Sequence, residues 1–356
     1  MEGGVYMNKF LEVAMSKEWF EKEGMKEEPA VWEDGIRIDT DKGKFEWWYF
    51  DAHLEDGTTV VAIFFTKSYA NINVPLTPLV KLSITTPEGK TYLKLIEFPK
   101  EKFSASDKQC HVEVANNWVK GDLKTYNLHI DFEDISADLQ FNRVVPSWRP
   151  GVGKCYFGEE KKDFFAWFVP IPYGTVNGKI KFEGKERDVK GTGYHDHNWG
   201  NIPLTKILDH WYWGRVDIGE YKSIFFEMIS SKKYGSERVN LFMFAKGDKI
   251  LTGDGSKLTL EKSNYITHSS GKKYPEELIF NWKDAEDNIK ISISNPEMLE
   301  DRSLLSGLPF FKRKIAGLVM NPYYFRFNGK TEIDVSYKDI KDSAKDKSLY
   351  EIMMLK

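Results

Sequence analysis

The sequence predicts an all-β protein made of two antiparallel β-domains in tandem, preceded by a short helical extension. From Phe45 onward, short apolar or alternating runs are separated by turn signals at a spacing of about 8–12 residues, which is typical of β-sandwiches and β-barrels. The chain of 356 residues also exceeds the roughly 250–300 residues that one hydrophobic core supports. We therefore expect an N-terminal extension over 1–40, an N-terminal domain over 41–205 and a C-terminal domain over 206–356.

Turn signals divide the N-terminal half into hairpins. A weak apolar stripe on a polar background predicts helix within residues 1–30. The run that starts at Phe45 predicts two strands joined at Asp56-Gly57, and a second hairpin is predicted around Glu88-Gly89. Asn177-Gly178 predicts a further turn. The rest of this half shows little helical pattern.

The C-terminal half repeats this pattern of short strand-like runs and turns, and one of its segments aligns with a segment of the N-terminal half. About seven further strand-like runs follow Asp209. Segments that start at Trp47 and Trp211 align at an offset of 211 − 47 = 164 residues. The aligned aromatic pairs are Trp47 with Trp211, Trp48 with Tyr212, and Tyr49 with Trp213. Self-similarity on the scale of a domain favours two tandem domains that join near Gly200–Asp209.

Composition excludes several classes of protein. The 51 basic and 54 acidic residues give a net charge of -3, whereas a general nucleic-acid binder needs a basic excess, so we expect no nucleic-acid partner. No apolar run reaches the roughly 18–20 residues that span a bilayer, and the N-terminus is too charged for a secretory signal. Cys110 and Cys155 are expected to be thiols of a cytoplasmic protein. The 11 Trp, 17 Tyr and 24 Phe suit an apolar cavity or an interface.

The segment GTGYHDHNWG, from Gly191 to Gly200, concentrates polar and aromatic side chains. Alternation in a strand places His195, His197 and Trp199 on one face, and Tyr194, Asp196 and Asn198 on the other. Such groups are expensive to bury without partners, so a polar network that fixes two domains together is one interpretation. A His-x-His pair also starts some metal sites, but no ligand spacing, HExxH or CxxC motif accompanies it, so we expect no metal.

A second segment, EWWYFD, alternates in the same way. Glu46, Trp48 and Phe50 share one face, and Trp47, Tyr49 and Asp51 share the other. A carboxylate between aromatic rings acquires a raised pKa if it is buried. The alternatives are a functional site and a strand at the rim of a sheet, with solvated acids and tryptophans in the core.

Together the two segments resemble the AttH-like and carotenoid 1,2-hydratase (hydroxyneurosporene synthase) superfamily. EWWYFD near the start of the β region and GTGYHDHNWG further along occur in that order, and the likeness extends over roughly residues 40–350. The resemblance implies two lipocalin-like β-barrel domains in tandem. It also implies catalytic roles for the His and Trp of the His-x-Trp string, here His197 and Trp199. The lysine-rich surface and the long N-terminal extension depart from the carotenoid enzymes.

The chemistry that fits these residues is acid-type addition to a carbon–carbon double bond. An alkene must be protonated at carbon, and the resulting cation must survive until a nucleophile reaches it. Asp196 or His197 could supply or relay the proton, and aromatic faces stabilise a cation by about 0.5–2 kcal/mol each. The expected catalytic residues are Glu46, Asp196, His197 and Trp199. The expected substrate-binding residues are Trp47, Trp48, Tyr49, Tyr194, Trp211 and Trp213.

Three functions remain open. The favoured one is an enzyme that hydrates, isomerises or cyclises an isoprenoid or other unsaturated lipid without a cofactor, since GxGxxG, Walker and GxSxG motifs are absent. The second is a carrier that binds a hydrophobic small molecule in the same cavity. The third makes the tryptophans an interface between domains. In the first two, the expected partner is a hydrophobic small molecule.

A water-insoluble substrate has to reach its site from a membrane or a carrier. Leu304–Met320 places Leu308, Phe310 and Phe311 before the cations Lys312, Arg313 and Lys314. Aromatic residues beside cations suit the headgroup boundary of an anionic bilayer. We therefore expect either a peripheral membrane contact at this segment or a buried loop and strand whose cations are solvated.

Overall fold

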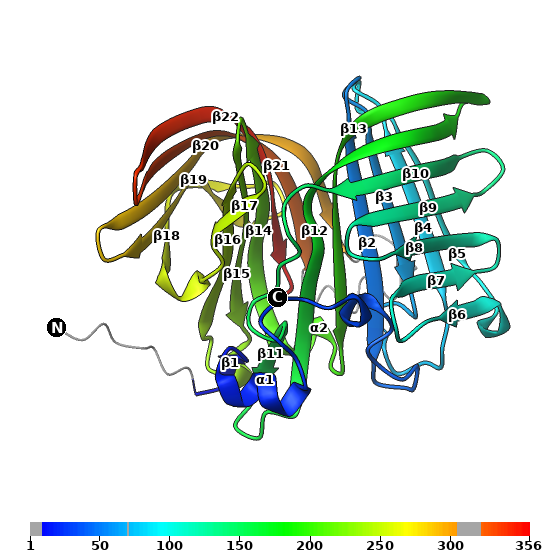
Figure 1. Cartoon of the computed structure of the whole chain (residues 1–356), viewed down its shortest axis with the longest axis horizontal. Helices are drawn as coiled ribbons and strands as arrows, with labels where there is room; N and C mark the ends of the chain where they lie inside the picture. Colours follow the sequence, from blue (N-terminus) through cyan, green and yellow to red (C-terminus); the bar gives the residue numbers. More distant parts are fainter. Residues whose placement is uncertain (1–8, 70, 305–321) are drawn as a thin grey trace. The chain divides into compact units, whose positions relative to one another are not determined.

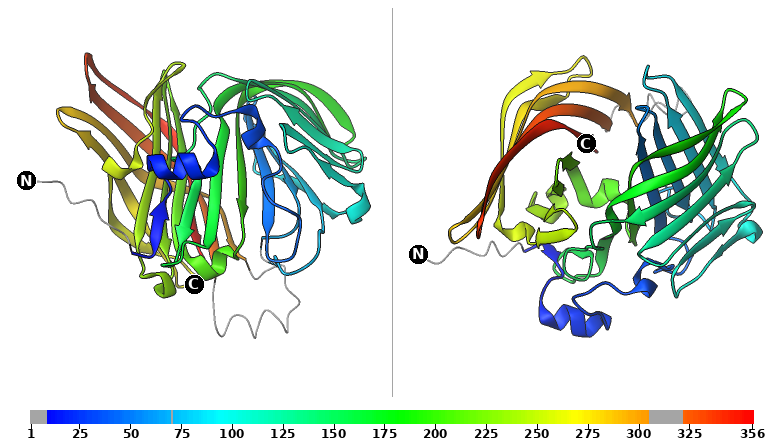
Figure 2. Two further views of the ribbon diagram at one scale, coloured as in Figure 1. Left: turned by 60° about the horizontal axis from the view of Figure 1, so that its bottom comes forward. Right: turned by 45° about the horizontal axis from the view of Figure 1, so that its top comes forward.

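The computed structural model describes residues 9–69, 71–304 and 322–356, and it consists almost entirely of antiparallel strands (Figure 1). The N-terminal unit is Val13–Leu204, and the C-terminal unit is Thr205–Lys356 with the described part of Met1–Glu12. Each unit is one sheet that curls on itself (Figure 2). The predicted all-β fold of two antiparallel domains is confirmed. Among the described residues, no helix is long and apolar enough to cross a membrane.

The N-terminal unit holds a large meandering sheet. Its strands are β2 (Phe45–Leu54), β3 (Thr59–Phe65), β4 (Leu79–Thr85), β5 (Thr91–Glu97), β6 (Phe103–Ala105), β7 (Cys110–Val114), β8 (Asn117–Gly121), β9 (Thr125–Asp131), β10 (Ser136–Arg143), β11 (Lys154–Phe157), β12 (Asp163–Phe182) and β13 (Lys185–Gly200). They follow the order β5-β4-β3-β2-β13-β12-β10-β9-β8-β7-β6, with β11 beside β12. The other early elements are β1 (Leu11–Val13), α1 (Lys17–Glu23), η1 (Val31–Asp34) and η2 (Lys100–Lys102).

The C-terminal unit repeats this design with fewer strands. Helix α2 (Leu204–Ile207) precedes them in the chain. The strands are β14 (Leu208–Ile218), β15 (Tyr221–Ser230), β16 (Arg238–Lys246), β17 (Lys249–Thr252), β18 (Leu258–Thr267), β19 (Lys273–Asp284), β20 (Asp287–Ser303), β21 (Tyr323–Tyr337) and β22 (Ile340–Met354), and the short 3-10 helices are η3 (Lys232–Tyr234) and η4 (Gly255–Lys257). Their order is β17-β16-β15-β14-β22-β21-β20-β19-β18.

Both sheets share one connectivity, in which the first long strand pairs with the last. Strand β2 pairs with β13, and β14 pairs with β22. Trp47 lies opposite Asn198, and its sequence match Trp211 lies opposite Met353. Asn198 of β13 and Met353 of β22 therefore occupy equivalent positions in the two sheets, and counting back from them along each strand gives three further equivalent pairs. These pairs are His195 with Tyr350, Asp196 with Glu351, and His197 with Ile352.

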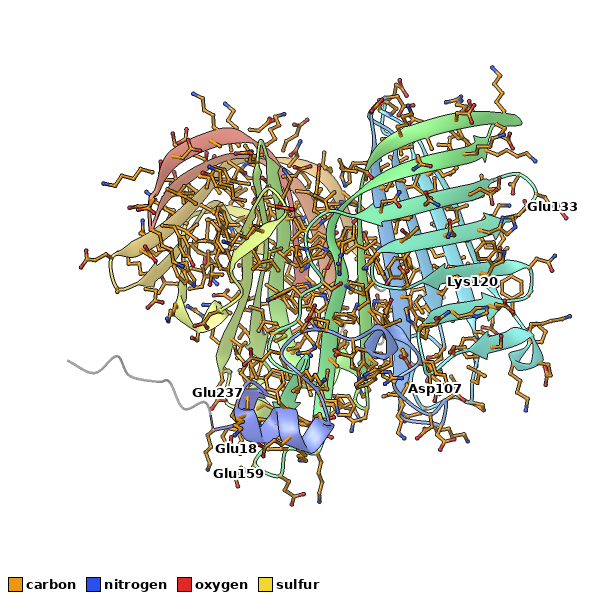
Figure 3. The ribbon with its side chains drawn as sticks, in the orientation of Figure 1. Glu18, Asp107, Lys120, Glu133, Glu159 and Glu237 are labelled. Atoms are coloured by element: carbon orange, nitrogen blue, oxygen red, sulfur yellow. The ribbon has the colours of Figure 1, made fainter. Side chains whose placement is uncertain are left out.

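Each unit has its own hydrophobic core on the concave side of its sheet. In the N-terminal unit, alternate residues of β2, Trp48, Phe50 and Ala52, point into this core. Charged side chains such as Lys120 and Glu133 lie on the exposed surface instead (Figure 3). Alternation therefore identifies the residues of β2 that face this core.

Two of the predicted turns are confirmed. Gly57 and Gly89 lie in the β2–β3 and β4–β5 hairpins and adopt φ values of +85° and +86°, which glycine tolerates best. Among residues 9–30, which the structure describes, the predicted helix is confined to α1, and it ends at Gly24 in the left-handed region. The segment predicted to contact a membrane lies outside the described residues apart from Leu304, and it stays a prediction.

The predicted turn at Asn177-Gly178 is wrong, because β12 continues through it. Asn177 pairs with Gln140 of β10, and the chain turns instead at Glu183-Gly184. A Cβ atom on Gly178 would lie 2.0 Å from the carbonyl oxygen of Asp138. Glycine therefore serves the close approach of two strands at this position rather than a turn.

Replacing Gly178 by alanine should destabilise the protein through this contact. We expect Gly178→Ala to lower the free energy of unfolding by about 2–3 kcal/mol, because β10 must shift and a positive φ is strained. Gly184→Ala is the matched control, since no atom lies within 4 Å of its added Cβ and its φ is also positive. There we expect a loss of about 1 kcal/mol. Equal losses in urea denaturation would contradict the close-approach explanation.

Candidate active site

Strand β13 divides the predicted site between two faces of the sheet. It pairs with β2 without a break from Gly191 to Gly200. The core face carries His195, His197 and Trp199 with Glu46, Trp48 and Phe50, and the opposite face carries Tyr194, Asp196 and Asn198 with Trp47, Tyr49 and Asp51. The predicted alternation is confirmed, and within this paired segment no bulge against β2 brings Asp196 to the side of His197.

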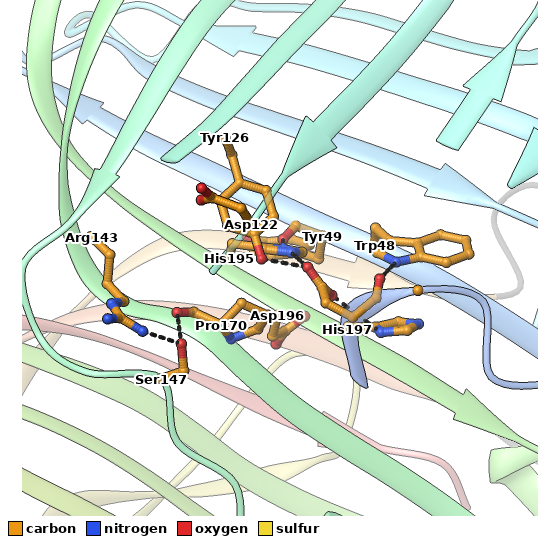
Figure 4. Close-up of polar contacts among 12 residues, drawn as sticks. Trp48, Tyr49, Asp122, Tyr126, Arg143, Ser147, Pro170, His195, Asp196 and His197 are labelled. Atoms are coloured by element: carbon orange, nitrogen blue, oxygen red, sulfur yellow. Dashed lines mark hydrogen bonds and ion pairs between the residues drawn. The ribbon is translucent and has the colours of Figure 1, made fainter. Parts of the chain in front are cut away.

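Asp34, the last residue of η1, links the two histidines of the core face. Its carboxylate lies 3.1 Å from Nε2 of His195 and 3.2 Å from Nδ1 of His197. The hydroxyl of Tyr126 donates to the same carboxylate at 2.5 Å, and the indole of Trp48 donates to the Asp34 carbonyl at 3.1 Å (Figure 4). One acidic residue thus collects contacts from three strands.

Glu46 extends this cluster at its other end. One carboxylate oxygen lies 2.6 Å from Nε2 of His197, and the backbone N–H groups of Arg37–Ile38 donate to the carboxylate at 2.7 and 3.3 Å. The order Glu46, His197, Asp34, His195 alternates acid and base, and all four side chains are fully buried. We call these four residues the acid–histidine quartet.

The contacts of His197 set the charge at the centre of the quartet. Its Nε2 hydrogen-bonds to Glu46, and its Nδ1 lies 3.2 Å from Oδ1 of Asp34 without a hydrogen bond, so two carboxylates beside the ring favour the imidazolium form. Burial disfavours this cation, but Asp34 and Glu46 outweigh burial and raise the pKa of His197. Burial also opposes ionisation of Asp34, yet the two histidines hold the pKa of Asp34 well below its usual range. Burial raises the pKa of Glu46, against the pull of His197.

Aromatic rings pack around the quartet and fill the core face. Phe50 stacks on His195 with ring centroids 3.8 Å apart, and Trp48 stacks on His197 at 4.7 Å. Trp199 contacts the ring of His197 at 4.8 Å and is 5% exposed. These residues therefore support β13 from inside the core.

The donor set around Asp34 does not favour a metal ion. Among the described residues, Asp34, Cys110 and His195 offer ligand atoms that lie within 4.8 Å of one another. Burial, with the neighbouring Asp34 carboxylate, raises the pKa of the Cys110 thiol well above its ordinary value, which disfavours the thiolate that binds metals. Asp34 already accepts the Tyr126 hydroxyl and faces two imidazole rings. We assign no metal to this group.

The opposite face presents Asp196 among hydrogen-bond donors. Its Oδ2 accepts the Tyr194 hydroxyl at 2.8 Å and the Trp167 indole N–H at 3.1 Å, and its Oδ1 accepts the Asn198 amide at 2.7 Å. Burial raises the pKa of Asp196 to about 6, although these donors and His195 oppose the shift. A carboxyl group with this pKa exchanges its proton near neutral pH, as a general acid must.

The other predicted substrate-binding residues are spread over both units. Trp48 lies in the core, whereas Trp47 and Tyr49 are half-buried on the Asp196 face. Trp211 and Trp213 belong to β14 of the C-terminal unit and are half-buried there. The structure therefore brings Tyr49, Trp47 and Tyr194 to the side of Asp196 and places Trp48 with the quartet.

Sequence reasoning missed Asp34, Tyr126 and Trp167. Asp34 lies in the predicted extension, where its neighbour Glu33 is buried against Arg149 at 2.6 Å and anchors η1. Tyr126 and Trp167 lie in segments that read as ordinary strands. The alternation of residues along a strand predicts the face on which a side chain lies. It does not predict which residue of a distant segment that side chain contacts.

Replacing His197 by glutamine should leave two buried carboxylates without the cation between them. We expect a loss of about 3–5 kcal/mol in the free energy of unfolding at pH 7, measured by urea denaturation. His129→Gln is the control, because its pair with Asp138 lies on the surface and should be worth less than about 1 kcal/mol.

The pH dependence of this loss tests the charge of His197. Because folding raises its pKa above 6.5, its stabilisation is complete below that pH and is lost as pH rises through the raised pKa. The difference in melting temperature between wild type and His197→Gln should therefore shrink at alkaline pH. A difference that stays constant with pH would contradict the imidazolium assignment.

Comparison with known proteins identifies relatives of this chain. A family model described as AttH-like matches residues 39–312. A hydroxyneurosporene dehydrogenase from Chlorobaculum tepidum is 29% identical over 207 residues, which cover 49% of this chain and 54% of that protein. A quinolone epoxide rearrangement protein from Emericella nidulans is 32% identical over 235 residues, which cover 59% of this chain and 60% of that protein. The matches thus span little more than half the length of these curated relatives.

The solved structure of the protein CghA has the same fold. It superposes with a TM-score of 0.61 at 12% sequence identity, and the match covers 97% of this chain and 98% of that one. The family match extends from just before β2 through β13 and most of the C-terminal strands, so it includes both segments that carry the site. The chain belongs to the AttH-like family.

Proposed function

We propose that this protein is a cofactor-independent enzyme that protonates an unsaturated hydrophobic molecule and thereby hydrates, isomerises or cyclises it. The observation that carries the proposal is Asp196, a buried carboxyl group with a pKa of about 6. Tyr194, Trp167 and Asn198 hold this group in one orientation. The proposed substrate is an isoprenoid or another polyunsaturated lipid, because an isolated alkene needs an acid in a site with little water and electron-rich walls.

The proposed reaction starts with proton transfer to carbon. The proton of the Asp196 carboxyl group forms a C–H bond with the π electrons of the alkene, and the neighbouring carbon becomes a cation. Water then adds and releases one proton, or the cation loses a proton from an adjacent carbon, with or without prior attack by a second double bond. One proton enters and one leaves, so the acid is restored. The rings of Trp167 and Tyr194 would stabilise the cation by about 0.5–2 kcal/mol each.

The acid–histidine quartet has a positioning role in this proposal. Asp196 lies between His195 and His197 on β13, so the contacts that fix both histidines also fix the backbone from which Asp196 projects. Glu46 and Trp199 would act in the same way, through the strand rather than on the substrate.

The matched relatives support chemistry on small molecules and leave the reaction open. One is named as a hydroxyneurosporene dehydrogenase and the other as a quinolone epoxide rearrangement protein. A general acid suits the opening of an epoxide as well as the protonation of an alkene.

Turnover in D₂O tests the proposal. We expect wild type, incubated with lycopene or squalene in detergent micelles, to place a deuteron on carbon in the product, which mass spectrometry detects. Asp196→Asn keeps the shape but lacks the acid and should lose at least about 100-fold in rate. Asp188→Asn, an exposed acid on the same strand, is the control and should keep its activity.

The rate should also follow the protonation of Asp196. Only the protonated carboxyl group donates, so kcat/KM should fall as pH rises through about 6, by about tenfold per pH unit beyond it. A protein that binds such a lipid but never deuterates it would be a carrier, and the enzymatic proposal would then fail.

A further inference from the structure

A second carboxylate, Asp51, lies on the same face of the sheet as Asp196. Both belong to Tyr-x-Asp segments, one starting at Tyr49 on β2 and the other at Tyr194 on β13. The antiparallel register places Tyr194 opposite Asp51 and Tyr49 opposite Asp196. These four residues, the Tyr–Asp array, therefore form two crossed pairs on neighbouring strands.

Each tyrosine of the array donates to the aspartate of its own strand. The Tyr49 hydroxyl donates to Oδ2 of Asp51 at 3.1 Å, and the Tyr194 hydroxyl donates to Oδ2 of Asp196 at 2.8 Å. The two rings meet edge to face with centroids 6.2 Å apart. Asp51 is 2% exposed and Asp196 is 8% exposed, so both carboxylates are buried.

Two buried acids on adjacent strands are unfavourable when both are ionised. Side chains at diagonal positions of an antiparallel pair lie within about 7–8 Å, and like charges at this range disfavour each other. Burial raises the pKa of Asp196 to about 6, so Asp196 is a group that can hold a proton near neutral pH. The array thus places a second buried carboxyl group on the strand next to Asp196.

The fold itself does not require two acids at these positions. In the C-terminal unit, the position of Asp51 is taken by Arg215 and that of Asp196 by Glu351, by the register of β14 with β22. The same pair of strands is therefore built there with one acid and one cation. An acid at both positions is therefore specific to the N-terminal unit.

We propose that Asp51 is a second catalytic residue, the proton acceptor of the reaction proposed above, on which this inference rests. Asp196 gives its proton to the alkene carbon. Asp51 then takes a proton from the water that adds to the cation, or from the carbon next to the cation, as the new C–O or C=C bond forms. Asp51 returns this proton to solvent, and Asp196 takes one up, so charge and atoms balance.

Deuterium exchange separates the two roles. In D₂O with squalene as the probe, Asp51→Asn should still protonate the alkene but fail to complete turnover, so the cation reverts to substrate. We expect product formation to fall at least tenfold, while deuterium in the recovered substrate stays equal or rises. Asp196→Asn should lose both signals. Asp188→Asn should match wild type in both.

The outcomes distinguish failure of the inference from failure of the proposed function. If wild type deuterates nothing, the proposed function fails first. If wild type is active and Asp51→Asn keeps the wild-type ratio of product to exchanged substrate, Asp51 is structural and the inference is overturned. The melting temperature of Asp51→Asn checks folding, and Asp51→Glu, which restores a carboxylate, should recover part of the turnover if Asp51 is the acceptor.

Discussion

The buried contact between His197 and its two carboxylates is the constraint on which the site depends. Asp34 comes from a short helix before the sheet, Glu46 from β2 and His197 from β13, so this contact fastens three separate segments at one point. Each charge alone would be costly in the core, and the alternation of sign makes the set tolerable. The strand that carries Asp196 is held in register by these contacts and by its backbone pairing with β2.

One strand therefore serves two purposes on its two faces. Its core face carries ionised and aromatic groups packed so closely that they act as structure, and its other face carries an acid whose protonation changes near neutral pH. The two kinds of group occupy adjacent positions in the sequence. A slip of one residue in the pairing with β2 would exchange the faces, which is why the firm register of β13 matters for chemistry as well as for stability.

Much of this arrangement could be predicted from alternation. The sharing of one face by His197, Trp199 and Glu46, and of the other by Asp196 and Tyr49, follows from a period of two residues. The contacts of Asp34 could not be predicted, because η1 reaches the core through a buried ion pair between Glu33 and Arg149 that lie 116 residues apart. Gly178 was misread for a similar reason, since its meaning depends on a neighbouring strand.

The C-terminal unit shows the equivalent strand positions without the two histidines. At the positions of His195 and His197 it carries Tyr350 and Ile352, both buried in an ordinary apolar core. Replacing a whole buried ion network by apolar side chains often leaves the stability unchanged or raises it. Removing one member of the network lowers the stability, because the remaining charges are then buried without a partner. A lineage that has once acquired the quartet can therefore leave it only through several coordinated substitutions. We therefore expect descendants to retain the quartet even where their chemistry no longer uses it.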